Sequence, residues 1–205
     1  MIEALIVIDV QNDFCPGGSL AVSCGDEIID PINALIDDAS LVVLSQDWHP
    51  SDHTSFAQNH DGKTPFMEIE MPYGPQTLWP NHCVQGTAGA EFHKRLNTDR
   101  ADAIIRKGMN PAIDSYSTFF ENDRKTPTGL LGFLRERDVT SLLLVGLATD
   151  FCVAFSALDA AANGFDVKIR MDACRGIDNA GSMDAALAEL RKTGVQFVNY
   201  WGGLP

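Results

Sequence analysis

The segment that most constrains this chain runs from residue 142 to residue 155 and reads as a buried strand, a tight turn and the start of a helix. Four apolar residues open it, and Thr149 and Asp150 in the turn are candidate helix caps. Cys152 then falls in the first helical turn, where unpaired N–H groups and the helix dipole favour a thiolate. This position suits a nucleophile. A small buried hydrophobic residue is an equally good interpretation, so other residues must decide.

Strand-like and helical segments alternate along the rest of the chain. This alternation predicts an α/β fold, a three-layer α/β/α sandwich around a central, mostly parallel six-stranded sheet. Because the sequence has no repeat, low-complexity tract or linker, we expect a single domain over residues 1–205. The predicted strands are 4–10, 41–46, 103–107, 142–145, 166–171 and 196–200, and the predicted helices are 26–38, 91–96, 128–137, 151–163 and 183–192.

The charge balance excludes two classes of partner. The chain carries 28 acidic against 15 basic residues, a net charge of -13, and has no basic run. Nucleic acid and anionic membrane surfaces should therefore be repelled. The N-terminal segment has no positive leader, and no apolar run approaches membrane-spanning length, so a cytoplasmic protein is expected.

The five cysteines do not suggest a cross-linked protein. They are odd in number, widely spread and contain no Cys-x-x-Cys pair, which argues against a disulfide framework and a four-thiolate zinc site. We expect free thiols in a reducing compartment.

Four chemically capable side chains stand at the carboxyl ends of four different predicted strands. They are Asp9, Asp47, Lys107 and Cys152. In a parallel sheet these ends share one edge, and ligands bind there. An ionised carboxylate in apolar surroundings is costly unless it is paired, so we assign Asp9 a function and leave the turn to Asp13.

A histidine-rich segment follows the second predicted strand. Asp47 and His49 are two residues apart, so in an extended chain their side chains point the same way. His82 can add a third ligand if the long loop 52–88 folds back. An Asp/His/His set suits zinc, manganese or ferrous iron. His53 stays open between a ligand and an outer partner.

The residues at the sheet edge allow acyl transfer through a thioester. Lys107 would favour the Cys152 thiolate, and Asp9 could take the thiol proton and later give it to a departing amine. Backbone N–H groups of Ala148 and Cys152 could hold the developing oxyanion. A metal-activated water with a structural cysteine is the alternative.

Five segments resemble the nicotinamidases of the isochorismatase-like cysteine hydrolase superfamily, and the similarity covers nearly the whole chain. The resemblance implies Asp9, Lys107 and Cys152 as catalytic residues and Asp47, His49 and His82 as metal ligands. The segments are Ile-Asp-Val-Gln-Asn-Asp-Phe at 8–14, Asp-Trp-His-Pro at 47–50, Leu-Trp-Pro-Asn-His-Cys-Val-Gln-Gly at 78–86, Lys-Gly at 107–108 and Gly-Leu-Ala-Thr-Asp-Phe-Cys-Val at 146–153.

The same resemblance implies hydrolysis of nicotinamide to nicotinate and ammonia in NAD salvage, with pyrazinamide as an analogue. One divalent ion would bind the ring nitrogen, zinc first, with manganese or ferrous iron as alternatives. Phe14 and Trp79 match the positions that sandwich the pyridine ring, and we add Tyr116 as a substrate contact. The family also implies a cis peptide bond before Ala148.

Three hypotheses about the function therefore remain open. The first is the cysteine amidase, and the second is another amidase or isochorismatase-type hydrolase, or an inactive relative that serves as an interaction domain. The third is a metal-dependent hydrolase without a covalent intermediate. Nicotinamide is the expected small-molecule partner, and a homo-oligomer is left open.

Overall fold

The computed structural model describes residues 2–199 and builds them around one parallel sheet. Within these residues the sheet has six strands in the order β5-β2-β1-β6-β7-β8, and every neighbouring pair is parallel. The predicted α/β fold with a six-stranded sheet is confirmed. The strands are β1 (Ile2–Ile8), β2 (Val42–Asp47), β5 (Ala103–Lys107), β6 (Val139–Leu147), β7 (Asp166–Arg175) and β8 (Gln196–Val198).

The strand order creates one crevice. The chain moves outward from β1 through β2 to β5, and then returns to the other side of β1 with β6, β7 and β8. β1 and β6 are therefore the neighbours at which the order reverses, with Ile8 opposite Gly146 at their carboxyl ends. In open α/β sheets this is the position at which ligands bind.

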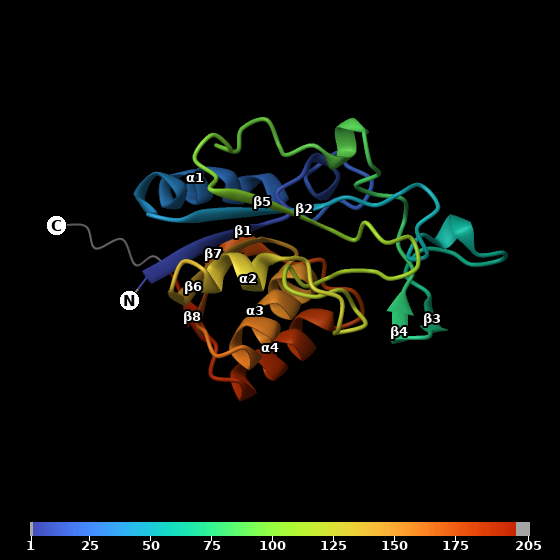
Figure 1. Cartoon of the computed structure of the whole chain (residues 1–205). Helices are drawn as coiled ribbons and strands as arrows, with labels where there is room; N and C mark the ends of the chain where they lie inside the picture. The colour runs from blue at the N-terminus through green and yellow to red at the C-terminus, as the bar shows by residue number, and fades with distance from the viewer. Residues whose placement is uncertain (1, 200–205) are drawn as a thin grey trace.

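Helices cover both faces of the sheet, as Figure 1 shows: α1 lies on one side and α2, α3 and α4 on the other. The alternation of side chains along β1 explains the two layers. Leu5 and Val7 join the core under α1, whereas Ile6 and Ile8 join the core under the other three helices. The helices are α1 (Ile29–Asp38), α2 (Leu130–Arg135), α3 (Ala154–Ala162) and α4 (Ser182–Lys192).

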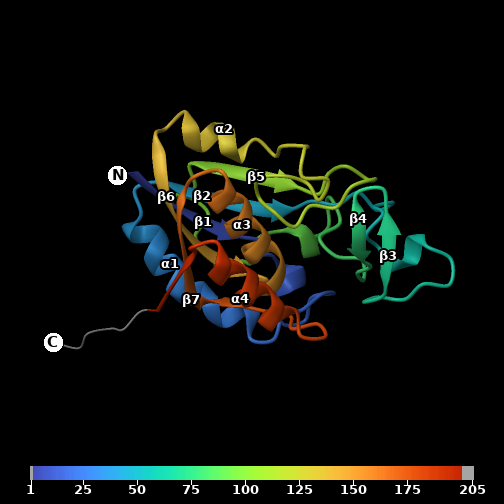
Figure 2. The ribbon, with the colours of Figure 1, turned by 90° about the horizontal axis from the view of Figure 1, so that it is seen from below.

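The segment 52–88, predicted to be a long loop, contains regular structure. β3 (Glu68–Met71) and β4 (Gly74–Thr77) form an antiparallel hairpin. These strands are short and largely polar, so their pattern gave no periodic signal. Figures 1 and 2 both place the hairpin beyond the carboxyl ends of the sheet strands, away from the N-terminus.

Three other predicted elements differ from the structure. The prediction of a short helix at 91–96 was wrong, because Phe92 instead forms a β-bridge with Gln11. The helix expected from residue 151 begins as a π-helical turn, Thr149–Val153, before α3. The last strand ends at Val198, and Tyr200 lies outside the described residues.

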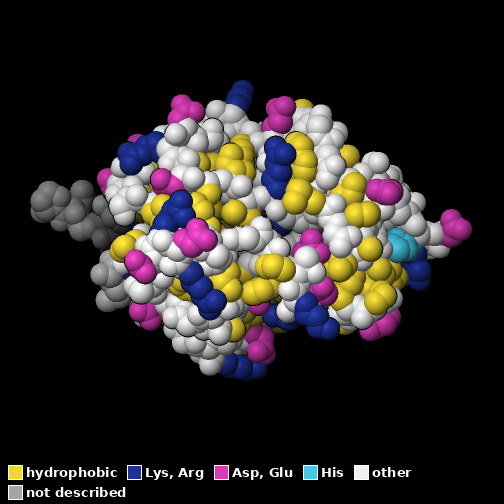
Figure 3. Space-filling view, viewed as in Figure 1, with side chains coloured by type: hydrophobic (Ala, Val, Ile, Leu, Met, Phe, Trp, Pro, Cys, Tyr) yellow, Lys and Arg dark blue, Asp and Glu magenta, His cyan; other side chains and the backbone are white. Residues whose placement is uncertain are grey.

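The surface agrees with the charge pattern of the sequence. On the face in Figure 3, acidic and basic side chains are interspersed, and no basic patch forms among the side chains that the figure colours. None of the helices within residues 2–199 combines the length and the apolar character needed to cross a membrane.

We predict that Gly146→Ala strongly destabilises the fold. Gly146 has φ +122°, and an added Cβ would lie 2.1 Å from the carbonyl oxygen of Ile8. The substitution combines backbone strain with a clash against a central strand, so it should lower the free energy of unfolding in urea by more than about 3 kcal/mol.

Gly164→Ala is the matched control for this measurement. Gly164 has φ +88°, but an added Cβ would meet nothing within 4 Å. Strain alone should cost about 1 kcal/mol there. Equal losses in the two variants would mean that the close approach of β1 and β6 is unimportant.

Candidate active site

The structure brings the four predicted strand-end residues together around one ammonium group. Lys107 Nζ lies 2.9 Å from Asp9 Oδ2 and 3.4 Å from Cys152 Sγ. It also pairs with Asp47 Oδ1 and donates a 2.8 Å hydrogen bond to the carbonyl oxygen of Ser115. All four predicted residues are buried. The convergence expected from the parallel sheet is therefore observed.

Lys107 stays charged in this setting. Burial by itself lowers the pKa of its ammonium, but the carboxylates of Asp47 and Asp9 outweigh burial and raise that pKa well above its usual value. The same attraction acts on Asp47: although burial opposes it, Lys107 and His49 hold the pKa of this carboxyl below its usual range. The ammonium of Lys107 and the carboxyl groups of Asp9 and Asp47 therefore form one interdependent cluster.

Asp9 occupies an unusual backbone and electrostatic position. Its φ is +49°, and its carboxylate accepts a 2.6 Å hydrogen bond from the hydroxyl of Ser45, which in turn accepts one from the Asp9 N–H. Burial raises the pKa of the Asp9 carboxyl, although Lys107 opposes the shift. A raised pKa suits a group that must accept and return a proton. Ser45 was not identified from the sequence as a partner of Asp9. The signal that could have indicated it is a hydroxyl side chain within an otherwise apolar strand.

Cys152 differs from expectation in its protonation. Burial raises the pKa of the thiol well above its ordinary value; Lys107 opposes this, and the charge of Asp9 adds to it. The neutral thiol is thus favoured at rest, whereas the sequence predicted a thiolate stabilised by a helix terminus. Desolvation is the largest cause of this shift in pKa, since the side chain is only 6% exposed. Attack by this sulfur would therefore require a base.

The Asp47, His49 and His82 side chains form a compact donor set. Asp47 Oδ2 lies 3.6 Å from His49 Nε2 and 3.9 Å from His82 Nε2. The Nδ1 atoms of the two histidines lie 2.9 Å from the Gly108 carbonyl oxygen and 2.8 Å from the Pro80 carbonyl oxygen. A carbonyl only accepts, so each Nδ1 carries a proton, and Nε2 is the atom of each imidazole that faces the Asp47 carboxylate.

This donor set fits a divalent cation. Its ligand atoms lie within 4.8 Å of one another, and all three residues are buried. Burial is the main cause that lowers the pKa of His82 to about 4, which keeps that imidazole in the neutral form that binds metals, whereas Asp47 raises the pKa of His49 against the effect of burial. The oxygen and nitrogen donors match the zinc, manganese or iron chemistry considered from the sequence.

His53 lies behind His49 rather than within this set. The two imidazole rings are 4.3 Å apart between centroids. Both nitrogens of His53 have protein partners, with Nδ1 2.7 Å from the Ser55 hydroxyl and Nε2 3.3 Å from the Ile113 carbonyl oxygen. The geometry thus places His53 against a ligand candidate, while its own role stays a prediction.

A small pocket opens beside Cys152. The three predicted substrate contacts, Phe14, Trp79 and Tyr116, all line it. Trp79 Nε1 donates a 3.2 Å hydrogen bond to the Tyr116 hydroxyl, which fixes two of these rings relative to each other. Other residues that line the pocket were not predicted, because they lie in irregular loops or look like ordinary apolar residues of a helix. They are Leu20, Asp114, Phe151 and Ile177.

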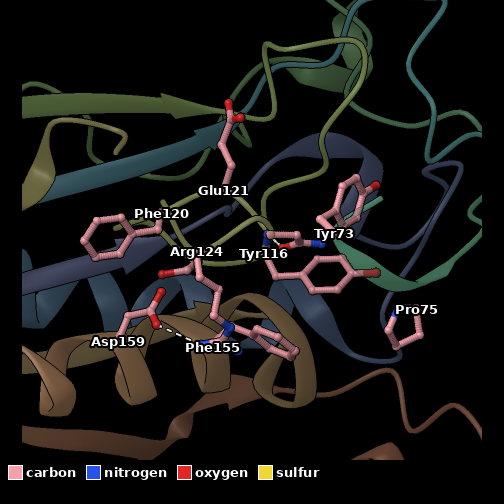
Figure 4. Close-up of a pocket in the computed structure, with 10 residues that line it drawn as sticks. Tyr73, Pro75, Tyr116, Phe120, Glu121, Arg124, Phe155 and Asp159 are labelled. Carbon is pink, nitrogen blue, oxygen red and sulfur yellow. Dashed lines mark hydrogen bonds and ion pairs between the residues drawn. The ribbon is translucent and has the colours of Figure 1, made fainter. Parts of the chain in front are cut away.

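Tyr116 also separates this pocket from a second one. The outer pocket has a volume of about 210 Å³ and includes Tyr73 and Phe155 in its lining. Figure 4 shows Tyr116 between these two rings, with the ion pair of Arg124 and Asp159 beside Phe155. Tyr116 is therefore an internal wall with a pocket on each side.

The turn before Cys152 borders the pocket through Ala148. The peptide bond between Leu147 and Ala148 is cis, as the family resemblance implied. Whether the N–H groups of Ala148 and Cys152 bind an oxyanion stays a prediction.

Comparisons with known proteins agree with this site. The isochorismatase domain matches residues 3–199. Nicotinamidase of Acinetobacter baylyi is 53% identical over 96% of this chain and 92% of its own length.

Among solved structures, the nicotinamidase/pyrazinamidase of Acinetobacter baumanii has 53% identity and a TM-score of 0.95, covering 96% of this chain and 95% of its own. The pyrazinamidase of Pyrococcus horikoshii, solved in complex with zinc, has 38% identity and a TM-score of 0.78, covering 98% and 100%. On these grounds the chain belongs to the isochorismatase family, together with the nicotinamidases that it resembles.

Proposed function

We propose that this chain is a nicotinamidase that hydrolyses nicotinamide to nicotinate and ammonia, with pyrazinamide as an analogue substrate. One observation carries the proposal: a single buried ammonium, that of Lys107, contacts both Asp9 and Cys152 as well as Asp47 of the metal-type set. In this proposal the shared ammonium joins an acyl-transfer site to a site that orients a heterocycle. The identity to curated nicotinamidases supports the same conclusion.

In the acylation step, Sγ of Cys152 attacks the carboxamide carbon while the Asp9 carboxylate takes the thiol proton. The raised pKa of the buried thiol makes this transfer necessary, and the raised pKa of Asp9 makes it easier. Backbone N–H groups of Ala148 and Cys152 hold the oxyanion in our proposal. Asp9 then gives its proton to the amide nitrogen, the C–N bond breaks, and ammonia leaves a thioester on Cys152.

Hydrolysis of the thioester uses the same groups in reverse order. The Asp9 carboxylate takes a proton from water as the water oxygen attacks the thioester carbon. The C–S bond breaks, nicotinate is released, and the proton returns from Asp9 to the sulfur of Cys152. Lys107 stabilises the charged forms of both groups throughout, since it lies next to both.

The pocket orients the ring in this proposal. Phe14 and Trp79 cover the pyridine faces, and Tyr116 holds Trp79 in place. Asp47, His49 and His82 would hold a divalent cation, with zinc preferred because the related pyrazinamidase was solved with zinc. Such an ion would supply a Lewis acid for the ring nitrogen.

The remaining features of the proposal concern the setting. We place the enzyme in the cytoplasm, in NAD salvage, with residues 1–205 as one domain and the association state open. The second candidate, a metal hydrolase without a covalent intermediate, draws on the same donor set but leaves the contact between Lys107 and Cys152 without a purpose.

The covalent mechanism predicts that Cys152→Ala lowers kcat for ammonia release by about 10⁴-fold or more. Cys174→Ala is the matched control, because Cys174 is also a buried cysteine but does not line the pocket. It should keep wild-type activity apart from any loss of folded protein, which circular dichroism would detect. Substantial turnover by folded Cys152→Ala would instead favour attack by a metal-activated water.

Asp9 and Lys107 should act as one unit. Lys107→Met alone leaves two buried carboxylates without their cation and should lower the free energy of unfolding by about 3 kcal/mol or more. Adding Asp9→Asn removes one of these carboxylates and should restore part of the stability. Activity should not recover, and each single variant should be about as inactive as the double variant. Additive losses in kcat would show that the two residues do separate jobs.

If the donor set anchors the substrate ring through a metal ion, the enzyme should strongly prefer substrates that carry a ring nitrogen. Benzamide has the shape of nicotinamide without that nitrogen, and a polar site left unpaired rejects such an analogue by about 10⁴-fold or more in kcat/KM. A chelator should lower nicotinamide turnover but leave Cys152 present and able to react with iodoacetamide, as measured by mass spectrometry. Comparable rates on benzamide would contradict the anchor.

A further inference from the structure

The connection between β7 and α4, residues 176–181, forms part of the pocket wall. Ile177 lines the pocket that also holds Cys152. The backbone of this connection is strained, because Asp178 and Ala180 have φ values of +55° and +50° without being glycine. A segment in such a conformation needs interactions that hold it in place.

Asp150 supplies those interactions. Its carboxylate accepts hydrogen bonds from the N–H groups of Ile177, at 3.0 Å, and Asp178, at 2.8 Å. It accepts a third from the hydroxyl of Ser182 at the start of α4. Asp150 is only 3% exposed, so this charge is held by the connection rather than by solvent. Charge-assisted hydrogen bonds of this kind are among the stronger ones in proteins.

These contacts replace the role that the sequence suggested for Asp150. It was a candidate helix cap, but the turn Thr149–Val153 has no side-chain cap hydrogen bond. The carboxylate instead reaches out to a segment about thirty residues away in the sequence. Because Asp150 lies two residues before Cys152, the turn that carries the nucleophile also holds the pocket wall.

The packing leaves little freedom for this arrangement to shift. A Cβ added to Gly176 would lie 3.1 Å from Asp150 Oδ1 and 2.9 Å from the sulfur of Met183. The connection therefore approaches the carboxylate as closely as a glycine allows. Loss of the carboxylate would remove the hydrogen bonds that hold the backbone of Ile177 and Asp178.

We propose that Asp150 is a positioning residue that fixes Ile177 relative to Cys152 and so sets how large a ring substituent the pocket accepts. This inference rests on the proposed function for its substrate class. Asp150 does not touch the reacting atoms in this view. Its effect is on discrimination between substrates, through the position of the wall.

The test compares Asp150→Asn with Asp178→Asn. Both remove one carboxylate and keep the side-chain shape, and asparagine tolerates the left-handed backbone of Asp178. The asparagine at 150 cannot accept all three hydrogen bonds, because its amide nitrogen is a donor. Asp178 is an exposed residue of the same connection and does not line the pocket, so it is the matched control.

The readout is the ratio of kcat/KM for nicotinamide to kcat/KM for ring-methylated nicotinamides. We expect Asp150→Asn to lower this discrimination by about tenfold for at least one methyl position, as loss of charge-assisted hydrogen bonds would. Asp178→Asn should leave it unchanged. Ile177→Ala by itself should also lower the discrimination, and the double variant with Asp150→Asn should show little further loss. An equal fall for all substrates, or additive effects, would overturn the proposal.

A second readout does not depend on activity. Trypsin cleaves after Arg175, immediately before the connection, and cleavage requires the segment to leave the protein surface. Asp150→Asn should be cut faster than wild type, and Asp178→Asn should not. Equal cutting rates would refute the anchor. If wild-type protein failed to hydrolyse nicotinamide, the proposed function would fall, while the trypsin comparison would still decide whether Asp150 holds the connection.

Discussion

The site depends on one buried ion cluster. The ammonium of Lys107 is removed from water, so it requires the carboxylates of Asp9 and Asp47 beside it, and each carboxylate requires the ammonium. Burial by itself would raise the pKa of both carboxyl groups. The cluster in turn fixes the distance between Cys152 and the donor set, because the same nitrogen also contacts the sulfur of Cys152. The proposed catalytic groups and the proposed metal ligands are thus parts of one electrostatic unit.

The sequence predicted the features that follow from the period and position of apolar runs. The six strands and the convergence of Asp9, Asp47, Lys107 and Cys152 could be inferred because parallel strands place their carboxyl ends at a common edge. The spacing of Asp47 and His49 indicated a shared direction. Local patterns were therefore sufficient to identify the residues that stand at strand ends or alternate along an extended segment.

Other features depend on contacts between distant segments, which carry no local signal. Asp114 lies in an irregular loop and accepts hydrogen bonds from Gln76 and its neighbour Ser115, so nothing in its own surroundings in the sequence marks it. The pKa of Cys152 was misjudged because desolvation depends on the whole pocket, not on one helical turn. Asp150 resembled a helix cap locally, while its partners lie in a connection that only the fold brings near.

The strand order has a consequence for how the enzyme can fail. Lys107 and the three groups around it come from the ends of β5, β2, β1 and β6, which are consecutive neighbours in the sheet but widely separated in the chain. A slip of one residue between β2 and β5 would break the register in which Asp47 lies opposite Lys107, and would turn one of these two side chains to the opposite face. Turnover is therefore a sensitive reporter of correct sheet assembly. A molecule whose strands pair out of register would lack the site altogether and would show no activity, rather than reduced activity.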